Sequence, residues 1–334
     1  MSHPARDHER AVALGAVRAA ARISARVQAT LAPGGRVDKK DRSPVTVADF
    51  AAQAAVCRVL AETFPDDPIM AEEDTSLLRK PGQDRLLGAV LDHLSAEFGA
   101  VGPAEIFDWI DRGRYRPGGG RAPAARFWAL DPVDGTKGFL RGEQYAVALS
   151  LIEDGRVVLG TLACPNLRVA GVDGAGTLFH ATRGGGSWAM PLVPEAAAAR
   201  RIRVSPTGDP AEMRMVESVA HADHALHATI AGRLGIAKPP VRLDSQAKYG
   251  LLAAGEAELY LRVPLPDKME YREKLWDHAA GAIVVEEAGG RVTDILGRPL
   301  DFTRGSRLVA NVGLVVTNGP LHDRIVHAVS LHLT

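Results

Sequence analysis

The stretch Leu130-Asp131-Pro132-Val133-Asp134-Gly135-Thr136-Lys137-Gly138 is the segment around which the chain and its predicted site are organised. It follows a short apolar run, residues 127–130, that we predict to be a strand. The strand should end at Asp131, because Pro132 has no N–H to donate to the next strand. The carboxylates of Asp131 and Asp134 lie three residues apart across a turn, so both can face the same point.

A pair of carboxylates held together in this way favours a bound cation. Two such charges share a site only if one is protonated or a cation lies between them. Oxygen ligands beside a space of phosphate size favour Mg²⁺. Gly135 allows a ligand to approach the backbone closely, and Thr136 places a hydroxyl beside it. The stretch also fits an ordinary turn, since Asp-Pro and Asp-Gly pairs are common there, so the decision rests on the rest of the chain.

The composition sets limits on the class of protein. A chain of 334 residues can form one large domain or two lobes. Lys plus Arg equals Asp plus Glu, at 40 each, so no overall field attracts nucleic acid or an anionic membrane. The only cysteines, Cys57 and Cys164, lie in apolar stretches, which suggests buried thiols in a reducing compartment. No secretory signal and no apolar stretch of about 18 residues is present, so we expect a soluble, cytoplasmic protein.

The spacing of apolar residues predicts alternating helices and strands along the chain. Helices are predicted at residues 9–31, 46–64, 84–98, 225–234, 245–255 and 277–288, and strands at 69–71, 127–131, 145–152, 156–164, near Val169 and Leu178, and at 216–219, 258–262, 306–308 and 313–317. The predicted strands at residues 145–152 and 156–164 should form a hairpin across Asp154-Gly155. A composition shift at 191–200 divides the chain into lobes 1–195 and 196–334.

One long segment lacks any periodicity. Residues 112–126 are rich in Gly, Pro and Arg, and we predict a mobile surface loop without a role in the chemistry.

Several acidic residues near predicted element ends have both an ordinary and a functional interpretation. Glu72 follows a strand, where α/β folds build sites, whereas Glu73 fits a solvated turn. Asp49 occupies the third position of a capping box that begins at Thr46, so helix capping explains it as well as catalysis does. Asp277 opens a predicted helix, where a cap and a metal ligand are equally feasible.

Four further polar residues lie at the edges of predicted elements: His224, Ser245, Lys248 and Arg262. Ser245 and Lys248 are three residues apart and so share one face of a helix. Taken one at a time, each is more often a surface residue than a ligand.

Together these stretches resemble a known family. Ser43-Pro44-Val45-Thr46 with Asp49, then Glu72-Glu73, then Asp131 to Thr136, then Trp276-Asp277-His278-Ala279-Ala280-Gly281 resemble the lithium-sensitive, magnesium-dependent phosphatases of the inositol monophosphatase superfamily. Residues 137–144, 243–249 and 260–262 are similar to its 3'(2'),5'-bisphosphate nucleotidase branch. The resemblance runs from about Arg10 to the C-terminus, and residues 112–126 are the part that does not match.

The resemblance implies a layered αβαβα sandwich of two lobes, with the active site in the crevice between them. It implies that one Mg²⁺ is held by Glu72, Asp131 and the Val133 carbonyl, a second by Asp131, Asp134 and Asp277, and a weaker third near Glu72. It implies that Asp49 and Thr136 orient and deprotonate the attacking water. The backbone amides of Gly135 and Thr136 would bind phosphate, and the substrate contacts would be His224, Ser245, Lys248, Arg262 and Asp277.

The implied reaction removes the 3'-phosphate of adenosine 3',5'-bisphosphate (PAP) and gives AMP and phosphate. The related 3'-phosphoadenylyl sulfate (PAPS) would be a second substrate, and the setting would be sulfur metabolism. A phosphatase for inositol or sugar phosphates is the nearer alternative, which Arg262 and the Ser245/Lys248 pair argue against. A nucleotide sensor without turnover is the more distant alternative, which the full set of acids argues against.

Overall fold

The structure is a computed structural model, and it describes residues 6–31, 43–117, 124–264 and 269–331. The helices are α1 (Asp7–Ala29), α2 (Ser43–Thr63), α3 (Asp84–Phe98), α4 (Pro103–Asp111), α5 (Thr136–Leu140), α6 (His224–Leu234), α7 (Ala247–Ala253), α8 (Ala279–Glu287) and α9 (His322–Ser330). The strands are β1 (Ile69–Ala71), β2 (Arg126–Asp134), β3 (Ala146–Glu153), β4 (Arg156–Cys164), β5 (Ala175–Thr182), β6 (Gly186–Val193), β7 (Arg200–Ile202), β8 (Met215–Glu217), β9 (Val241–Arg242), β10 (Leu259–Arg262), β11 (Arg291–Thr293) and β12 (Leu314–Thr317).

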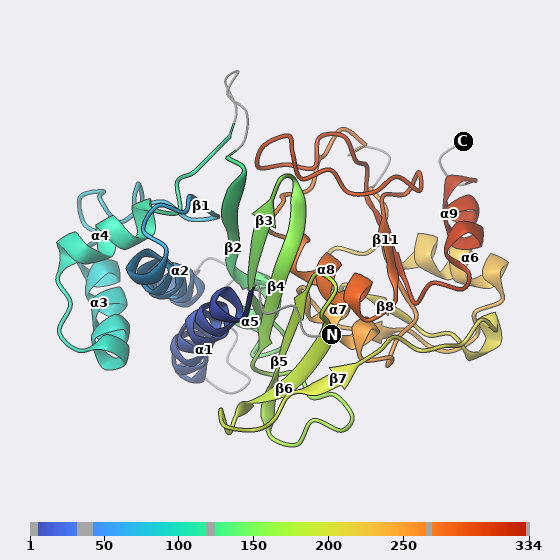
Figure 1. Ribbon diagram of the computed structural model, residues 1–334, viewed down its shortest axis with the longest axis horizontal. Coiled ribbons are helices and arrows are strands. Elements are labelled where there is room, and N and C mark those ends of the chain that lie inside the picture. The colour runs from blue at the N-terminus through green and yellow to red at the C-terminus, as the bar shows by residue number, and fades with distance from the viewer. Residues whose placement is uncertain (1–5, 32–42, 118–123, 265–268, 332–334) are drawn as a thin grey trace.

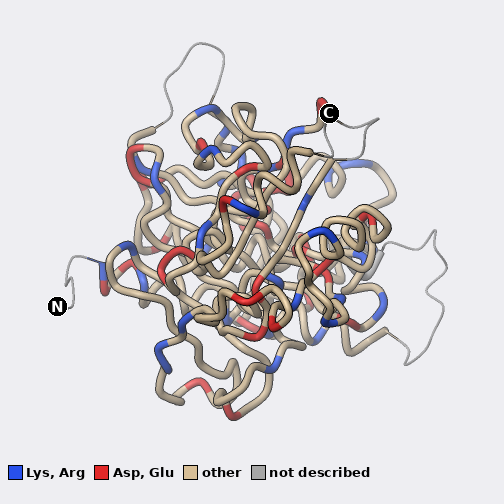
Figure 2. The backbone as a smooth tube through the Cα atoms, turned by 90° about the vertical axis from the view of Figure 1, so that its right-hand side faces the viewer, with Lys and Arg blue, Asp and Glu red and all other residues tan. Residues whose placement is uncertain are grey.

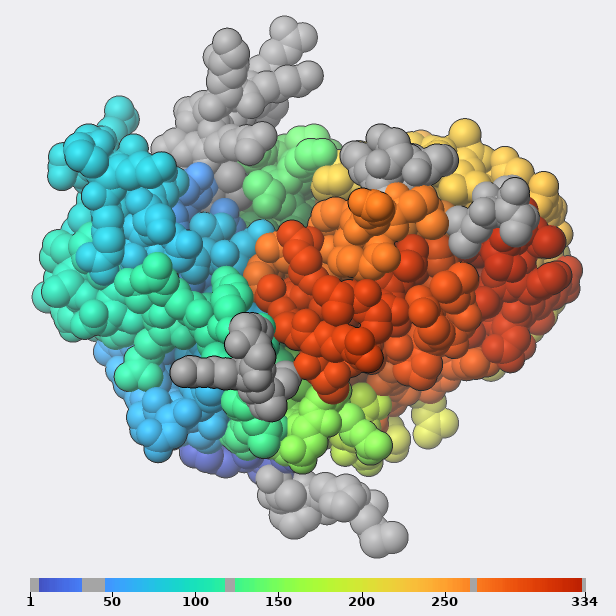
Figure 3. Space-filling view, turned by 90° about the horizontal axis from the view of Figure 1, so that it is seen from above, coloured from blue at the N-terminus to red at the C-terminus, as the bar shows by residue number. Residues whose placement is uncertain are grey.

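These elements stack in five layers, which Figure 1 shows from left to right. Helices α1 and α2 pack on one face of a seven-stranded sheet, and α8 packs on its other face. Helix α8 also contacts the five-stranded second sheet, whose outer face is covered by α6 and α9. This is the αβαβα order that the resemblance implies. In Figure 3 the N-terminal half of the chain lies on the left and the C-terminal part on the right.

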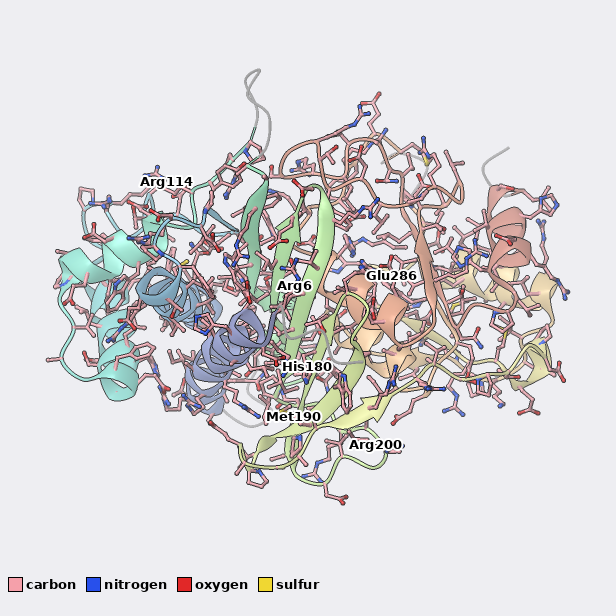
Figure 4. All side chains as sticks on the ribbon, in the orientation of Figure 1. Arg6, Arg114, His180, Met190, Arg200 and Glu286 are labelled. Carbon is pink, nitrogen blue, oxygen red and sulfur yellow. The ribbon has the colours of Figure 1, made fainter. Side chains whose placement is uncertain are left out.

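The seven-stranded sheet has the order β1-β2-β3-β4-β5-β6-β7. Strand β1 runs parallel to β2, and the later pairs are antiparallel. Its central strands are buried on both faces because helices cover both faces. On one face, Arg18 of α1 donates a hydrogen bond to Met190 Sδ of β6 at 2.9 Å, and Figure 4 labels this methionine beside the helix.

Helix α8 lies unusually close to the first sheet. A Cβ added to Gly160 of β4 would be 2.4 Å from Ile283 Cγ2 and 2.8 Å from the Ala280 carbonyl oxygen. A Cβ on Gly281 would be 2.4 Å from Cγ of Tyr249 on α7. Such distances are impossible for a side chain, so both glycines are needed for α8 to fit between the sheet and α7.

Strand alternation explains why side chains of both sheets meet in the middle layer. In β2, Phe127 and Ala129 face the core that includes α7 and α8, so Asp131, two residues further on, faces the same way. In β10, Leu259 and Leu261 face the outer helices, whereas Tyr260 faces the inner core. Residue 262 therefore also faces the middle layer.

Several predicted elements are confirmed. Helix α3 and strand β1 have the predicted bounds, and β3 and β4 form the predicted hairpin. Asp154 and Gly155 at its turn have φ angles of 46° and 74°, as a tight hairpin turn requires. The division into lobes 1–195 and 196–334 stays a prediction, and β7 at residues 200–202 belongs to the first sheet.

Other predictions are wrong. Residues around Val169 form a turn, in which the Val172 N–H donates to the Val169 carbonyl, and no strand. Residues 306–308 form a single bridge, between Arg307 and Lys274, and no strand of their own. Helix α2 begins at Ser43, so Thr46 is not its N-cap and the predicted capping box does not exist.

Lys and Arg are interspersed with Asp and Glu over the face of the molecule that Figure 2 shows, in line with the equal totals in the sequence. None of the helices in the described part of the chain is both long and apolar enough to cross a lipid bilayer.

Candidate active site

A large cavity opens where the end of β2 meets the starts of α5 and α7 and the turn before α8. Its volume is about 1040 Å³. Most of the predicted site residues line it: Glu72, Asp131, Val133, Asp134, Gly135, Thr136, Ser245, Lys248, Arg262 and Asp277. The structure therefore brings together residues that are up to 205 positions apart, from Glu72 to Asp277.

The central stretch forms an irregular strand end. Strand β2 continues to Asp134, but its pairing with β3 shifts between Asp131 and Asp134, so the predicted end at Asp131 is three residues early. Pro132 lies within this irregular part, where a residue without an N–H is tolerated. Gly135 follows with a φ of 90°, and a Cβ there would be 2.8 Å from the Cβ of Ser245. The turn after β2 thus requires glycine in order to contact the turn before α7.

The turn before α7 is strained. Ser245 has a φ of 72°, which is costly for a residue with a side chain. Two hydrogen bonds with site residues hold this turn. The Gln246 amide donates to the Asp134 carboxylate, and Lys248 Nζ donates to the Ser245 carbonyl at 2.6 Å. Helix α7 begins at Ala247, so Ser245 lies outside it and does not share a helix face with Lys248 as predicted.

Glu72 follows β1, and the buried side chain of Gln53 fixes this position. The Gln53 side chain accepts from the Glu73 N–H at 2.9 Å and donates to the Glu73 carbonyl at 2.7 Å. A Cβ on Gly113 would be 2.8 Å from atoms of both Ala71 and Gln53, so residue 113 lies against the same strand.

The predicted role of residues 112–126 is therefore wrong in part. The Tyr115 N–H donates to the Ile69 carbonyl at 3.0 Å, and Arg116 donates to the Ala71 carbonyl. The Arg116 guanidinium also lies 5.1 Å from the centre of the Trp276 ring. The start of the segment supports the strand that carries Glu72, and Arg126 begins β2, while residues 118–123 lie outside the described part of the chain.

The acids in the cavity repel one another strongly. Burial, followed by the charges of Glu72, Asp134 and Asp277, raises the pKa of Asp131 well above its ordinary value. Burial and the charges of Asp134 and Glu72 do the same to Asp277. Burial and the charge of Asp134 also raise the pKa of Glu72. A multivalent cation would relieve this repulsion.

The acids also have the chemistry of a metal site. Asp131 is 3% exposed, and its Oδ1 has no hydrogen-bond partner within the described residues. A buried carboxylate oxygen without a partner is costly unless a cation binds it. Glu273, Asp277 and His278 offer ligand atoms that all lie within 4.8 Å of one another. The donor set, rich in carboxylates, suits a hard divalent cation.

Cationic residues line the cavity beside the acids. Lys248 is 4% exposed, and burial lowers its pKa to about 8, although Asp134 acts in the opposite direction. The side chain of Arg262 donates from Nε to Glu273 Oε1 at 2.6 Å. Lys137 and Arg141 also line the cavity, as does His221, whose pKa is lowered mainly by burial.

Two predicted site residues do not line this cavity. Asp49 lies in α2, where burial and the charges of Glu73 and Glu72 raise its pKa well above the ordinary value. It therefore lies near the acids but behind the cavity lining. His224 begins α6 with Nδ1 2.8 Å from Glu217 Oε1, and its contact with the substrate stays a prediction.

Sequence reasoning missed residues that the structure places in the cavity. His221 lines it in place of His224. The two histidines are three residues apart, and no spacing rule distinguished them. Glu73, which we interpreted as part of a solvated turn, does not line the cavity, but it is half-buried, and burial and the charges of Glu72 and Asp74 raise its pKa to about 7.

Comparison with solved structures identifies the fold. An inositol monophosphatase from Anabaena superposes with a TM-score of 0.61 over 97% of this chain and 95% of that chain, at 21% sequence identity. At this identity the match establishes the layered αβαβα fold alone.

The family follows from the sequence. A model of the inositol monophosphatase family matches residues 7–333, so the chain belongs to the inositol monophosphatase family. A 3'(2'),5'-bisphosphate nucleotidase of Emericella nidulans is 44% identical over 88% of this chain and 90% of its own length. A protein of the same name from Oryza sativa is 42% identical over 96% of this chain and 93% of its own length.

Proposed function

We propose that this protein is a Mg²⁺-dependent phosphatase that removes the 3'-phosphate of adenosine 3',5'-bisphosphate. The products are AMP and phosphate, and 3'-phosphoadenylyl sulfate is a second substrate. The observation that carries the proposal is that one cavity is lined both by the acids Glu72, Asp131, Asp134 and Asp277, of which Asp131 is buried, and by the cations Lys248 and Arg262. The names of the relatives that are about 40% identical support the choice of a nucleotide. A place in the cytoplasm and in sulfur metabolism remains a prediction.

The cation would be held by Glu72, Asp131, the Val133 carbonyl, Asp134 and Asp277, and two or three ions per site remain the expectation. When bound, Mg²⁺ supplies positive charge that neutralises these acids, polarises the phosphoryl group and increases the acidity of water. Asp131 is central to this set because its pKa responds to the charges of Glu72, Asp134 and Asp277.

The chain's own groups would divide the remaining chemistry. Asp49 would accept the proton of the attacking water as the general base. Thr136 lines the cavity, and its hydroxyl would orient that water. The bond between phosphorus and the 3'-oxygen breaks as the bond to the water oxygen forms. The ribose oxygen leaves as a hydroxyl by taking a proton from solvent water, and Asp49 afterwards returns the proton that it accepted to the solvent.

Recognition of the rest of the substrate requires charges beyond the acid cluster. The 5'-phosphate is a dianion, and Lys248 and Arg262 are the cations that we assign to it. Ser245 and His221 line the same cavity. Inositol 1-phosphate has no second phosphate and would leave these cations unmatched.

An assay of phosphate release separates this proposal from its alternatives. Adenosine 3',5'-bisphosphate, 3'-phosphoadenylyl sulfate and inositol 1-phosphate are each given to the protein with Mg²⁺ and with excess chelator. We expect turnover of the two nucleotides with Mg²⁺ only. A preference for inositol 1-phosphate would make the protein an inositol phosphatase, and binding of the nucleotide without turnover would make it a sensor.

A further inference from the structure

A buried carboxylate, Glu273, lies beside the cavity and is not among the residues that we assign to Mg²⁺ or to the substrate. Glu273 is 6% exposed and does not line the cavity itself. Its Oε1 accepts a hydrogen bond from Arg262 Nε at 2.6 Å, and its Oε2 lies 3.4 Å from His278 Nε2. Each of these two partners does line the cavity. One carboxylate therefore contacts two cavity residues that come from different elements.

The backbone around Glu273 is fixed. The Leu308 N–H donates to the Glu273 carbonyl at 2.9 Å, and the Leu275 N–H donates to the Ser306 carbonyl at 3.0 Å. On the far side of the network, the Tyr249 hydroxyl lies 2.8 Å from His278 Nδ1, and both rings are almost fully buried. The carboxylate is thus held in place from the backbone and from its partners.

Glu273 keeps its charge in this position. Burial alone would raise its pKa, but the hydrogen bond and charge of His278, together with those of Arg262, lower it to about 2. A charged acceptor forms a shorter and stronger hydrogen bond than a neutral one. Its bond to Nε orients the planar guanidinium and does not use the two terminal amino groups. The Tyr260 hydroxyl, from the same cavity lining, also forms a hydrogen bond with the Arg262 side chain.

We propose that Glu273 is a positioning residue that fixes the Arg262 guanidinium for the second phosphate of the substrate. The inference rests on the proposed function, since it concerns how the same cavity selects a bisphosphate. A planar group with a fixed orientation can form two parallel hydrogen bonds to a phosphate, whereas a mobile one first loses entropy. Selectivity for the bisphosphate would then depend on a residue that never contacts it.

Two other roles for Glu273 predict different results. As a merely structural partner of a buried cation, it would affect all substrates alike. If the negative charge of Glu273 instead offsets the positive charge of Arg262, it reduces the affinity for phosphate. Removal of Glu273 would then tighten binding of the bisphosphate. The sign and the substrate dependence of the change in KM distinguish the three roles.

The experiment compares adenosine 3',5'-bisphosphate with adenosine 3'-monophosphate, which lacks only the 5'-phosphate. Glu273→Ala should raise KM for the bisphosphate by about tenfold or more, with kcat little changed, and leave KM for the monophosphate near that of the wild type. Glu273→Gln keeps an oxygen that accepts from Nε, so it should shift KM in the same direction but less. In an Arg262→Ala background, Glu273→Ala should cause no further rise.

Glu258→Gln is the matched control, because Glu258 is also 6% exposed and accepts a hydrogen bond, from the Arg214 N–H at 2.6 Å, away from the cavity. It should lower Tm without changing either KM. A fall in KM for the bisphosphate in Glu273→Gln, or equal changes for both substrates, would overturn the inference. If the wild type turns over neither nucleotide, the proposed function fails. Binding of the bisphosphate, measured by calorimetry, then tests the inference. We expect the Glu273→Gln variant to bind the bisphosphate more weakly than the wild type. Equal affinity of the two proteins, or no binding by the wild type, would contradict the inference.

Discussion

The carboxylate of Asp134 accepts a hydrogen bond from the backbone amide of Gln246, which lies 112 residues later in the chain. The Gln246 side chain then donates to the Trp276 carbonyl at 3.0 Å and accepts from the Gly281 N–H at 3.0 Å. One buried residue therefore joins the end of β2 to both segments that flank Asp277. The relative positions of Asp134 and Asp277 depend on it.

Gln246→Ala should therefore reduce both stability and activity. It leaves the Trp276 carbonyl and the Gly281 N–H without their partner, at a cost of about 1–3 kcal/mol for each buried group that stays unpaired. Phosphate release should fall because two acids of the site lose their common support. Chemical unfolding and turnover measured on the same preparation test this. An unchanged unfolding midpoint would show that water or another group replaces the side chain.

Arg262→Ala should impair only substrates with a second phosphate. Loss of a charged hydrogen bond is worth about 1.5–3 kcal/mol, which should appear as a higher KM for adenosine 3',5'-bisphosphate. Hydrolysis of adenosine 3'-monophosphate should change little. The mutation leaves Glu273 buried beside His278 without its cation, so Tm is recorded for each variant. Equal losses on both substrates with a lower Tm would assign Arg262 to the fold.

Asp49→Asn separates catalysis from stability. Helix α2 begins at Ser43, so Asp49 does not cap it, and no capping energy should be lost. The raised pKa of Asp49 means that its charge destabilises the metal-free protein. We therefore expect an unchanged or higher Tm in chelator, together with a rate lower by about 10²–10⁴ because the general base is gone. A rate near that of the wild type would remove Asp49 from the chemistry.

The acid cluster predicts that stabilisation by Mg²⁺ depends on pH. Burial and neighbouring charges raise the pKa of Asp131 and Asp277, and raise that of Glu73 from 4.5 to about 7. A carboxyl group whose pKa is raised by folding stabilises the fold below its unfolded pKa, and this stability is lost as the pH rises through the folded pKa. For Glu73 that window is pH 4.5 to about 7.

In excess chelator, Tm should therefore fall across this window. Mg²⁺ binds the ionised acids, so it should raise Tm more at about pH 8 than at about pH 5. Asp131→Asn removes the central acid and should reduce the gain at the higher pH. Equal gains at both pH values would show that the acids are not the binding site.

Much of the fold could be predicted because helical and strand periods are local properties. Helix α3 and the β3–β4 hairpin follow from their apolar spacing and from Asp154-Gly155. Strand β6 was missed because it contains Pro191, which normally argues against a strand. Strand β7 pairs only with residues 187–189, so β6 has an open edge at Pro191, where the missing N–H costs nothing. Helix α4 was missed although Pro103 and Glu105 mark its start.

Some residues of the site could likewise be predicted from the sequence, and others could not. Asp131 and Asp134 stand out as a pair of carboxylates beside Pro and Gly, but only the resemblance of the whole chain to a known family implied which acids hold the metal. His221 could not be chosen over His224, because only the path of the chain before α6 decides which one lines the cavity. The contact of Glu273 with Arg262 was equally hidden, since an acid eleven residues after an arginine has no preferred geometry. Residues that act through other residues leave little trace in a single sequence.

The central claim is that Mg²⁺-dependent cleavage occurs at the 3'-phosphate of a nucleotide, and phosphorus NMR of the products tests it most directly. The protein is incubated with adenosine 3',5'-bisphosphate and Mg²⁺, and a parallel sample contains excess chelator. We predict inorganic phosphate and adenosine 5'-monophosphate in equal amounts with Mg²⁺, and unchanged substrate with chelator. Formation of adenosine 3'-monophosphate, or full turnover in the chelated sample, would contradict the account.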